Sequence, residues 1–477
     1  MVEKTRVDTV IVGAGIAGLS AAFEADQLGA KVVVLEKLKA ARGNTYYSGG
    51  GSLFKVSASW QEMVQEADRT GKGKVDLGLV KTFAQKVNGS IDWLAAQGLE
   101  WFEAYESMPV SGREASCIAQ DSLGKSRVKG YGRAICRTLV SAVEKRGIDV
   151  WYQTRAEKIL TEGDGKIVGL RVKRGSDRIE LKTGSVILAT GGFQGNKDMV
   201  KKYLEPSLTK AKYSGSPLNT GDGHVMALEL GAQLVNADQW HASLRNKHRI
   251  NPYPRLQYGS ILINSSGQRF VNEIQNTKDH IAKDTLRQKG CWGAIVFDEQ
   301  FRRLSTAGFQ EHLGEFLVKA IPPVRKTELH EIEEYLIEDG TLIRASSLRE
   351  VSERLAVPYS NLENTIEEYN DNIENYQWQG IKPHGTPDPC KIETPPFYAE
   401  KVLGRFNCTL GGIKINQEAQ VMNQNGEPIG GLYAAGEIIG GFYYDNYQVI
   451  TGYLPVCLVF GRIAGINAAK AALSLTP

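Results

Sequence analysis

Cysteine is scarce in this sequence, and its spacing excludes several kinds of site. The chain has six cysteines among 477 residues, and none of them forms a C-x-x-C pair. A structural zinc site or a dithiol redox site is therefore not expected, and no other metal site is predicted. The scattered thiols are typical of reduced, mostly buried cysteines in a cytosolic protein.

Long runs of one residue class are also missing. With 57 Lys and Arg against 54 Asp and Glu, the net charge is only +3 and no basic block stands out, which disfavours nucleic acid as a partner. No run of 18 apolar residues suggests a membrane span. The first residues, MVEKTR, lead directly into a predicted strand and leave no room for a signal peptide. We therefore expect a soluble, cytoplasmic protein.

The clearest positive signal is a nucleotide-binding unit in residues 6–37. An apolar run, VDTVIV, leads into Gly13, Gly15 and Gly18, and a second apolar run, KVVVLE, ends at Glu36. The first glycine allows a sharp turn, the second lets backbone N–H groups approach a pyrophosphate, and the third lets a helix pack closely on the strand. An acid at the end of the second strand can accept hydrogen bonds from ribose hydroxyls. The unit predicts a dinucleotide site but does not choose FAD over NAD.

Motifs along nearly the whole chain distinguish between FAD and NAD. The sequence resembles the fumarate reductase/succinate dehydrogenase flavoprotein family, which includes fumarate and urocanate reductases, tricarballylate dehydrogenase and 3-ketosteroid Δ1-dehydrogenases. The matching segments follow the family's order and are VGAGIAGL, RGNTYYSGGG, ATGGF, NTGDGHVMALELGA, GQRFVNE, TLGGIKIN, LYAAGE and FGRIAG.

The resemblance implies that FAD is the cofactor. It places the glycines at the pyrophosphate, Glu36 at the ribose, the backbone of Ala156 at the adenine, and Asp222 and Glu437 at the ribityl chain. The family's covalent flavin histidine would fall near Tyr46, so we expect FAD without a covalent link. The residues implied to bind FAD are Gly13, Gly15, Ala17, Gly18, Glu36, Lys37, Asn44, Thr45, Ser48, Gly49, Gly50, Ala156, Thr190, Gly191, Asp222, Gly436, Glu437 and Thr451.

The same resemblance implies the catalytic positions, and most of them depart from those of fumarate reductases. His241 matches their substrate histidine, whereas Lys278 replaces their catalytic arginine. Asn407 and Cys408 stand where they have a second histidine, and Tyr447 stands where they have a carboxylate-clamping arginine. Tyrosine and cysteine do not reproduce an arginine fork, which argues against a dicarboxylate substrate.

Phenols are frequent in the segment GGFYYDNYQVITGYLPV. Tyr447 lies 13 residues before Phe460, as a ketone-binding tyrosine does in 3-ketosteroid Δ1-dehydrogenases, and the N–H of Thr451 is a second candidate donor. Lys278, His241 or Tyr443 would then move the proton. The sequence offers Arg113, Arg133 and Arg405 as further partners for a substrate carboxylate.

These observations predict an FAD-dependent oxidoreductase that desaturates a small ketone or keto acid, such as a cyclic keto acid, α,β to its carbonyl. One alternative is the reverse type of reaction, reduction of an activated alkene such as fumarate, urocanate or another enoate. Another is a non-catalytic FAD-binding protein. In both enzyme hypotheses the partner is a small-molecule ketone, keto acid or carboxylate. The sequence does not identify the electron acceptor.

The expected fold class is α/β. We predict a discontinuous Rossmann-like FAD-binding domain in residues 1–245 and 404–477, with an α+β substrate-capping domain inserted at 246–403. A β-meander is expected within 125–188, with a hairpin turn at 163–165. Two amphipathic helices are expected in the capping domain, from TELHEIEEYLIE and PYSNLENTIEEYNDNIENY. The active site is expected where the second domain covers the flavin.

Overall fold

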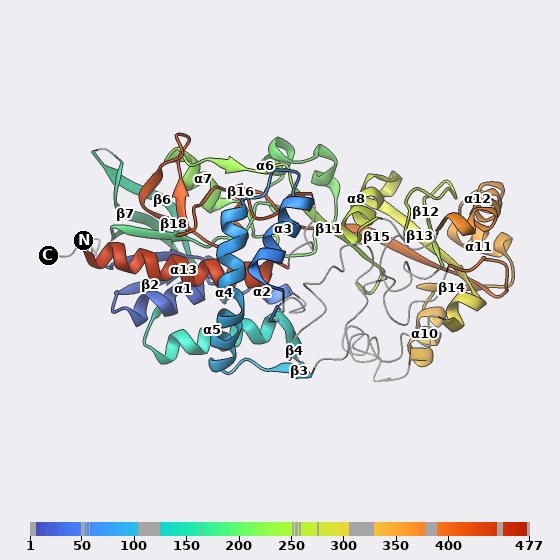
Figure 1. Cartoon of the computed structure of the whole chain (residues 1–477), viewed down its shortest axis with the longest axis horizontal. Coiled ribbons are helices and arrows are strands. Elements are labelled where there is room, and N and C mark those ends of the chain that lie inside the picture. The colour runs from blue at the N-terminus through green and yellow to red at the C-terminus, as the bar shows by residue number, and fades with distance from the viewer. Residues whose placement is uncertain are drawn as a thin grey trace.

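A computed structural model of the chain shows two lobes, with both termini at the far end of the larger one (Figure 1). The structure describes residues 6–48, 53, 55–56, 58–103, 125–163, 165–249, 252, 256, 259–273, 276–304, 329–376, 389–445 and 452–474.

A six-stranded sheet forms the centre of the larger lobe, and three of its inner strands are short, apolar and fully buried, as in a parallel sheet covered on both faces. Neighbouring strands run parallel except at the β17 edge. In order across the sheet, the strands are β17 (Gln420–Met422), β18 (Pro428–Ala434), β9 (Ser185–Leu188), β1 (Thr9–Val12), β2 (Val32–Leu35) and β5 (Asp149–Trp151). This sheet confirms the predicted nucleotide-binding topology, in which β1, a helix and β2 follow one another.

Smaller antiparallel sheets surround this centre. The predicted meander is confirmed as β6 (Thr154–Glu162), β7 (Lys166–Arg174) and β8 (Asp177–Lys182), with Glu162 and Lys166 as the last pair of the first hairpin. Two further pairs are β10 (Leu234–Val235) with β16 (Gly412–Ile413), and β3 (Trp101–Glu103) with β4 (Lys125–Val128).

The smaller lobe is built on a five-stranded antiparallel sheet. Its strands are β11 (Trp240–Arg245), β12 (Ile261–Ile263), β13 (Trp292–Asp298), β14 (Leu342–Ala345) and the long β15 (Phe397–Thr409), which pairs with β11, β13 and β14. The predicted domain borders fall at the end of β11 and inside β15. The chain therefore passes between the predicted domains through the paired strands β11 and β15.

Helices cover these sheets. The two predicted capping helices are confirmed as α10 and α12. The helix bounds are α1 (Ile16–Gln27), α2 (Asn44–Tyr47), α3 (Trp60–Thr70), α4 (Leu77–Ala96), α5 (Tyr131–Lys145), α6 (Lys197–Tyr203), α7 (Asp222–Glu229), α8 (Lys278–Arg287), α10 (Leu329–Glu338), α11 (Leu348–Leu355), α12 (Tyr359–Asp371) and α13 (Tyr453–Ser474), with short 3-10 turns at Pro206–Lys210, Lys289–Cys291 and Ile373–Tyr376.

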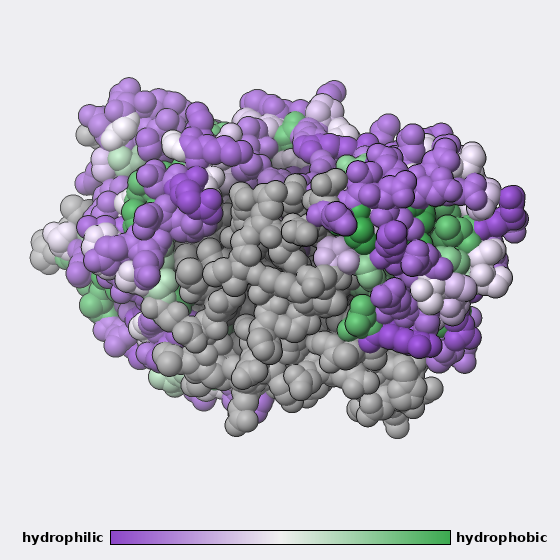
Figure 2. Space-filling view, turned by 45° about the vertical axis from the view of Figure 1, so that its right-hand side comes forward, coloured by the Kyte–Doolittle hydropathy of each residue, from purple (hydrophilic) through white to green (hydrophobic). Residues whose placement is uncertain are grey.

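Helix α13 is long and apolar enough by composition to cross a membrane, but its packing gives another reason for that composition. Of its most apolar window, 67% is buried inside the protein, so this helix is weak evidence for a span. It lies against α1 and α4 within the larger lobe. The described part of the face in Figure 2 is mainly hydrophilic, with small apolar areas.

Two glycines allow α13 to approach α1 closely. A Cβ at position 461 would lie 2.4 Å from the Ala17 carbonyl oxygen, and one at position 465 would lie 2.2 Å from that of Ala21. Because the nearest atoms belong to the backbone of α1, they cannot move aside as a flexible side chain would. The close contact of these helices supports the N-terminus of α1 at the nucleotide site.

We expect Gly465→Ala to lower the free energy of unfolding by about 1–3 kcal/mol, since the added methyl group forces the helices apart. Urea unfolding measures this change. Gly89→Ala is the control, because Gly89 lies on the exposed face of α4 with no atom near its missing Cβ. An equal effect of the two substitutions would contradict the close α1–α13 contact.

Candidate functional site

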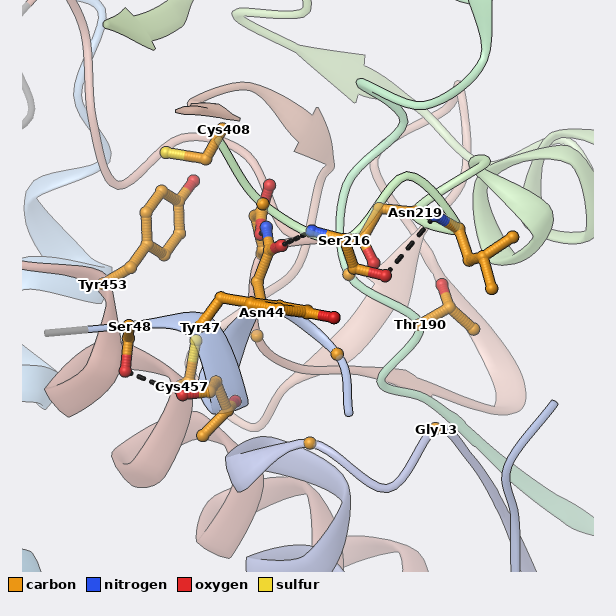
Figure 3. Close-up of a pocket in the computed structure, with 18 of the residues that line it drawn as sticks. Gly13, Asn44, Tyr47, Ser48, Thr190, Ser216, Asn219, Cys408, Tyr453 and Cys457 are labelled. Carbon is orange, nitrogen blue, oxygen red and sulfur yellow. Dashed lines mark hydrogen bonds between the residues drawn. The ribbon is translucent and has the colours of Figure 1, made fainter. Parts of the chain in front are cut away.

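One cavity of about 630 Å³ contains most of the residues that the sequence analysis singled out. It extends from the end of β1 and the start of α1, past α2 and the 214–222 segment, to β11, α8, β15 and the start of α13. Figure 3 shows Gly13 on one side of it and Cys408 and Tyr453 on the other, with Asn44 and Ser216 between them.

The three glycines of the first turn have different surroundings. Gly13 has φ +111°, and a Cβ there would lie 2.3 Å from the Ala189 carbonyl oxygen. A Cβ on Gly18 would lie 1.8 Å from the Gly13 carbonyl oxygen, so Gly18 serves helix–strand packing and does not line the cavity. A Cβ on Gly15 would meet only Thr45 Oγ1, at 3.4 Å, because Gly15 faces the cavity. The N-terminus of α1 therefore opens onto a space that an anion can fill.

Glu36 lies at the end of β2 with its carboxylate buried at the cavity wall. It accepts hydrogen bonds from the backbone N–H groups of Ala14 at 3.0 Å and Leu38 at 2.9 Å. Burial raises the pKa of Glu36 despite these bonds. Ala156 also lines the cavity, and its contact with an adenine stays a prediction.

Asp222 also lies at this end of the cavity. Its carboxylate is 3.0 Å from Lys37 Nζ and 2.9 Å from Arg155 Nη2, and it accepts a hydrogen bond from Thr220 Oγ1. Burial favours a higher pKa for Asp222, but Lys37, Thr220 and Arg155 together lower it. These partners group Asp222 with the residues expected at the adenosine, and its assignment to the ribityl chain stays a prediction.

Buried polar atoms in the cavity wall fit a polar cofactor. Thr190 Oγ1 and Asn219 Nδ2 are buried and have no hydrogen-bond partner among the described residues, and both residues line the cavity. Such groups are costly unless a ligand or water satisfies them. Together with the space at Gly15 and the acid at Glu36, they fit the pyrophosphate, sugar and adenine of a dinucleotide.

Glu437 is a buried carboxylate at the centre of the site. It accepts hydrogen bonds from Asn44 Nδ2 at 2.7 Å, from Gln194 Nε2 and from the Thr409 backbone N–H. Burial raises the pKa of Glu437 to about 7, although the hydrogen bonds act in the opposite direction. No cation is among these partners, so Glu437 can be protonated near neutral pH.

His241 on β11 and Lys278 on α8, two of the three residues considered for proton transfer, both line the cavity wall. His241 Nδ1 lies 2.8 Å from Asp279 Oδ1, which also accepts the Ala242 N–H at 2.7 Å. Lys283 Nζ lies 2.9 Å from the other oxygen of Asp279. Burial alone would raise the pKa of Asp279, but His241 and Lys283 lower it. An ionised Asp279 therefore orients the imidazole through Nδ1.

Lys278 is the first residue of α8 and lines the cavity. Burial lowers the pKa of Lys278 to about 8. An ammonium group with that pKa can release a proton near neutral pH, which an exposed lysine cannot do readily.

Cationic side chains gather at the same end of the cavity. The sequence analysis had named Arg405, whereas it missed Arg245 and Arg249, which also line the wall. Arg245 and Arg405 lie on the neighbouring strands β11 and β15, and Arg249 follows β11. The pairing of these strands could not be read from the sequence, and the two missed arginines carry no motif of their own.

The structure does not place Tyr443 at the cavity. It is 2% exposed and packs between Phe442 and Tyr453, with ring centroids 4.9 and 4.8 Å away, and it is absent from the described residues that line the wall. Tyr453 lines the wall in its place and donates a hydrogen bond to the Leu410 carbonyl oxygen. The proposed proton-transfer role of Tyr443 is thus corrected, because its ring completes an aromatic core cluster.

Several predicted positions cannot be placed. Tyr447, Thr451, Gly49, Gly50 and Arg113 lie outside the described residues. Arg133, the other arginine considered for a carboxylate, is described, but it stacks over the Tyr46 ring with its guanidinium 5.3 Å from the centroid. All other residues expected to bind FAD, apart from Gly18, line the cavity.

Asp445 contacts side chains of both lobes. Its carboxylate lies 2.7 Å from Lys72 Nζ and 3.1 Å from His280 Nε2, while Lys283 Nζ donates to its carbonyl oxygen at 2.9 Å. The hydrogen bond to Asp445 is the main reason that the pKa of His280 is raised, and burial and Lys283 oppose it. His280 and Lys283 belong to α8, so this contact holds the helix that carries Lys278.

This contact predicts a pH-dependent contribution to stability. Because the folded-state pKa of His280 lies above its unfolded value, the contribution is fully present below about pH 6.5 and is lost as pH rises through the folded-state pKa. We expect His280→Gln to lower the thermal midpoint more at about pH 6 than at about pH 9. A difference between the two proteins that does not change with pH would contradict this assignment.

The chain matches a family model and several known reductases and dehydrogenases. A family model described as an FAD binding domain matches residues 8–448. A probable fumarate reductase of Shewanella frigidimarina is 29% identical over 486 residues, which cover 99% of this chain and 76% of that protein. A urocanate reductase of Eggerthella lenta is 29% identical over 491 residues, covering 98% and 75% of the two chains.

A dehydrogenase and a solved structure complete the comparison. A 3-oxosteroid 1-dehydrogenase of Mycolicibacterium smegmatis is 27% identical over 383 residues, covering 73% of this chain and 64% of that protein. The solved open conformation of a flavocytochrome c3 fumarate reductase has a TM-score of 0.74 and 27% identity, covering 98% of this chain and 79% of that one. The resemblance and the mixed α/β fold expected from the sequence are thereby confirmed.

Proposed function

Because the chain belongs to the FAD binding domain family and is an FAD-dependent oxidoreductase acting on CH–CH bonds, we propose that it reduces an activated alkene that carries a carboxylate. This is the enoate alternative of the sequence analysis, and it replaces ketone desaturation as the preferred reading. The observation that carries it is the group of cationic side chains, Lys278, Arg245, Arg249 and Arg405, on the cavity wall. Such a wall attracts an acid and offers no particular advantage to a neutral ketone.

The residues of the chain would bind the acid and deliver one proton. Bound FAD supplies hydride chemistry through its N5 atom. Lys278 is the proposed proton donor to the carbon next to the carboxylate, and His241, oriented by Asp279, donates a hydrogen bond to the substrate. The net change is addition of one hydride and one proton across the double bond, so atoms and charge balance.

Two further features support this direction. Fumarate and urocanate, in the names of two relatives, are unsaturated acids. Two phenols line the described part of the cavity. Tyr453 donates its hydrogen bond to the Leu410 carbonyl oxygen and so has less capacity to polarise a ketone, and Tyr47 is 54% exposed. Because the family is catalytic, the reading as a non-catalytic protein is not retained.

We also propose that FAD is held without a covalent bond. Tyr46 stands near the position of the family's flavin-linking histidine, and the guanidinium groups of Arg42 and Arg133 lie 5.4 and 5.3 Å from its ring centroid. A phenol flanked in this way is a packed aromatic group with no nucleophilic nitrogen. Acid precipitation of the holoenzyme should therefore release all flavin into the supernatant, whereas flavin retained on the protein would contradict a non-covalent link.

Steady-state assays test the direction of the reaction. With reduced methyl viologen as electron donor, we expect turnover with crotonate or cinnamate, and little dye reduction when a saturated ketone such as 4-oxocyclohexanecarboxylate is the electron donor. Dye-coupled oxidation of the ketone without turnover of either acid would reject the proposal and restore the desaturase reading.

A further inference from the structure

Arg405 is a buried cation on the cavity wall. It is 9% exposed and lies on β15 opposite Ser243 of β11. Its Nε atom donates to Ser214 Oγ at 3.1 Å, and its Nη2 atom donates to the Tyr213 carbonyl oxygen at 3.3 Å. No carboxylate among the described residues pairs with it, and it lines the cavity.

Three other arginines in partly or fully enclosed positions of the described chain have a carboxylate partner. Arg462 lies 2.6 Å from Glu24, Arg269 lies 2.6 Å from Glu273, and Arg302 lies 2.7 Å from Glu299. Arg405 departs from this pattern. Burying a guanidinium that has only neutral partners destabilises the folded protein when no anion is bound. An anion in the cavity would offset that destabilisation.

A second cation strengthens the case. Arg249, which follows β11, also lines the cavity, and burial together with the charge of Arg249 lowers the pKa of Arg405. Two like charges that face one cavity repel each other, and an anion between or beside them would offset this repulsion. Arg249 has φ +62°, a backbone conformation that few non-glycine residues adopt and that is often found at functional positions.

We propose that Arg405, supported by Arg249, binds the carboxylate of the substrate and makes this enzyme selective for unsaturated acids over their neutral analogues. The inference rests on the proposed function, because it assigns the acid-binding residue of the same site. Ser243, the strand partner of Arg405, is two residues beyond His241, or about 7 Å along β11. The acid group would therefore be held to one side of the residues that handle the proton.

Arg405 would also replace the carboxylate-binding arginine that fumarate reductases have at the position of Tyr447. The guanidinium is fixed by Ser214 and Tyr213, so its remaining N–H groups are oriented before the substrate arrives. Tyr213 is itself held in place, because its hydroxyl donates to Asn44 Oδ1 at 2.8 Å. A pre-oriented fork loses less conformational entropy when it binds a carboxylate than a flexible side chain does.

Charge-matched substrate pairs test the assignment. Crotonate and cinnamate are compared with crotonamide and cinnamamide, using the holoenzyme and its Arg405→Met variant. For the better acid, we expect kcat/KM to fall by about 10²-fold or more, as loss of two charge-assisted hydrogen bonds implies. The matching amide should change by no more than about threefold. Arg405→Lys should give an intermediate loss, and Lys247→Met, at an exposed lysine paired with Asp339, is the control.

Thermal stability separates ligand binding from a structural role. If Arg405 is an unpaired buried charge, Arg405→Met should leave the melting temperature of the substrate-free holoenzyme unchanged or raise it. If its main role is to hold Tyr213 and Ser214, the variant should melt several degrees lower. A lower melting temperature together with equal losses for acid and amide would overturn the proposal.

Binding of crotonate and cinnamate to the oxidised holoenzyme, followed through the flavin absorbance, distinguishes the two proposals. If these acids bind and Arg405→Met abolishes binding, but reduced enzyme is not reoxidised by them, the proposed reaction fails and the acid site stands. If acid and amide are both reduced and Arg405→Met affects them alike, the reaction stands and the acid site fails. If neither acid perturbs the flavin of the wild-type protein, the acid site is rejected.

Discussion

Replacing Lys278 by methionine is expected to slow alkene reduction by roughly 10²–10⁴-fold, the usual contribution of a positioned general acid. Lys278 begins α8 and lines the same cavity as His241, and it belongs to none of the residues expected to bind FAD. The variant should therefore bind FAD like the wild type and lose only the proton-transfer step. Lys289→Met, at an exposed position beyond the end of α8, is the matched control.

The pH dependence of the rate tests the same assignment independently. Burial lowers the pKa of Lys278 to about 8, and a general acid works only when protonated. The rate should fall as pH rises through about 8 in the wild type. In Lys278→Arg, whose guanidinium stays protonated, this fall should move to much higher pH. A wild-type profile that is unchanged in Lys278→Arg, or full activity of Lys278→Met, would remove Lys278 from the mechanism.

Gly15→Val is expected to yield a folded protein that binds FAD about 10²-fold more weakly or not at all. A Cβ at this position meets only Thr45 Oγ1, at 3.4 Å, so the fold has room there for a small side chain. The valine would instead project into the cavity at the N-terminus of α1, where backbone N–H groups are expected to contact the pyrophosphate. Hydrogen bonds to a charged group contribute about 1.5–3 kcal/mol each, and losing two of them accounts for the weaker binding.

Flavin content per purified chain and circular dichroism measure the two parts of this prediction. Gly89→Ala should keep full flavin content and gain about 0.5–1 kcal/mol of stability, because alanine is the better residue in an exposed helix. Gly15→Val protein with a full complement of FAD would contradict the position of the pyrophosphate. A Gly15→Val protein without native circular dichroism would contradict the claim that this glycine faces open space.

The nucleotide site could be predicted from the sequence because its determinants are local. Gly13, Gly15, Gly18 and Glu36 lie within one β–α–β unit, and each role follows from residue type and spacing. The structure agrees on the different surroundings of the three glycines, including the contact of Gly18 with Gly13. The residues further along the chain were placed by resemblance, and most of them line the same cavity.

The acid-binding part of the site could not be predicted with the same security, because it depends on how distant segments pair. Arg405 faces the cavity because β15 pairs with β11, and His241 is oriented because α8 brings Asp279 beside it. Nothing in the local pattern distinguishes Arg405 from a surface arginine. In the same way, a run of tyrosines does not show which ring is buried, and the structure places Tyr453 at the cavity and Tyr443 in the core.

The most direct test of reduction of an unsaturated acid is a single-turnover experiment without oxygen. Fully reduced holoenzyme is mixed with crotonate or cinnamate, and oxidised holoenzyme is mixed with 4-oxocyclohexanecarboxylate, while the visible flavin absorbance is followed. We predict that at least one acid restores the oxidised spectrum rapidly and that the ketone leaves the oxidised spectrum unchanged. Rapid bleaching by the ketone, with reduced enzyme inert toward both acids, would contradict this account.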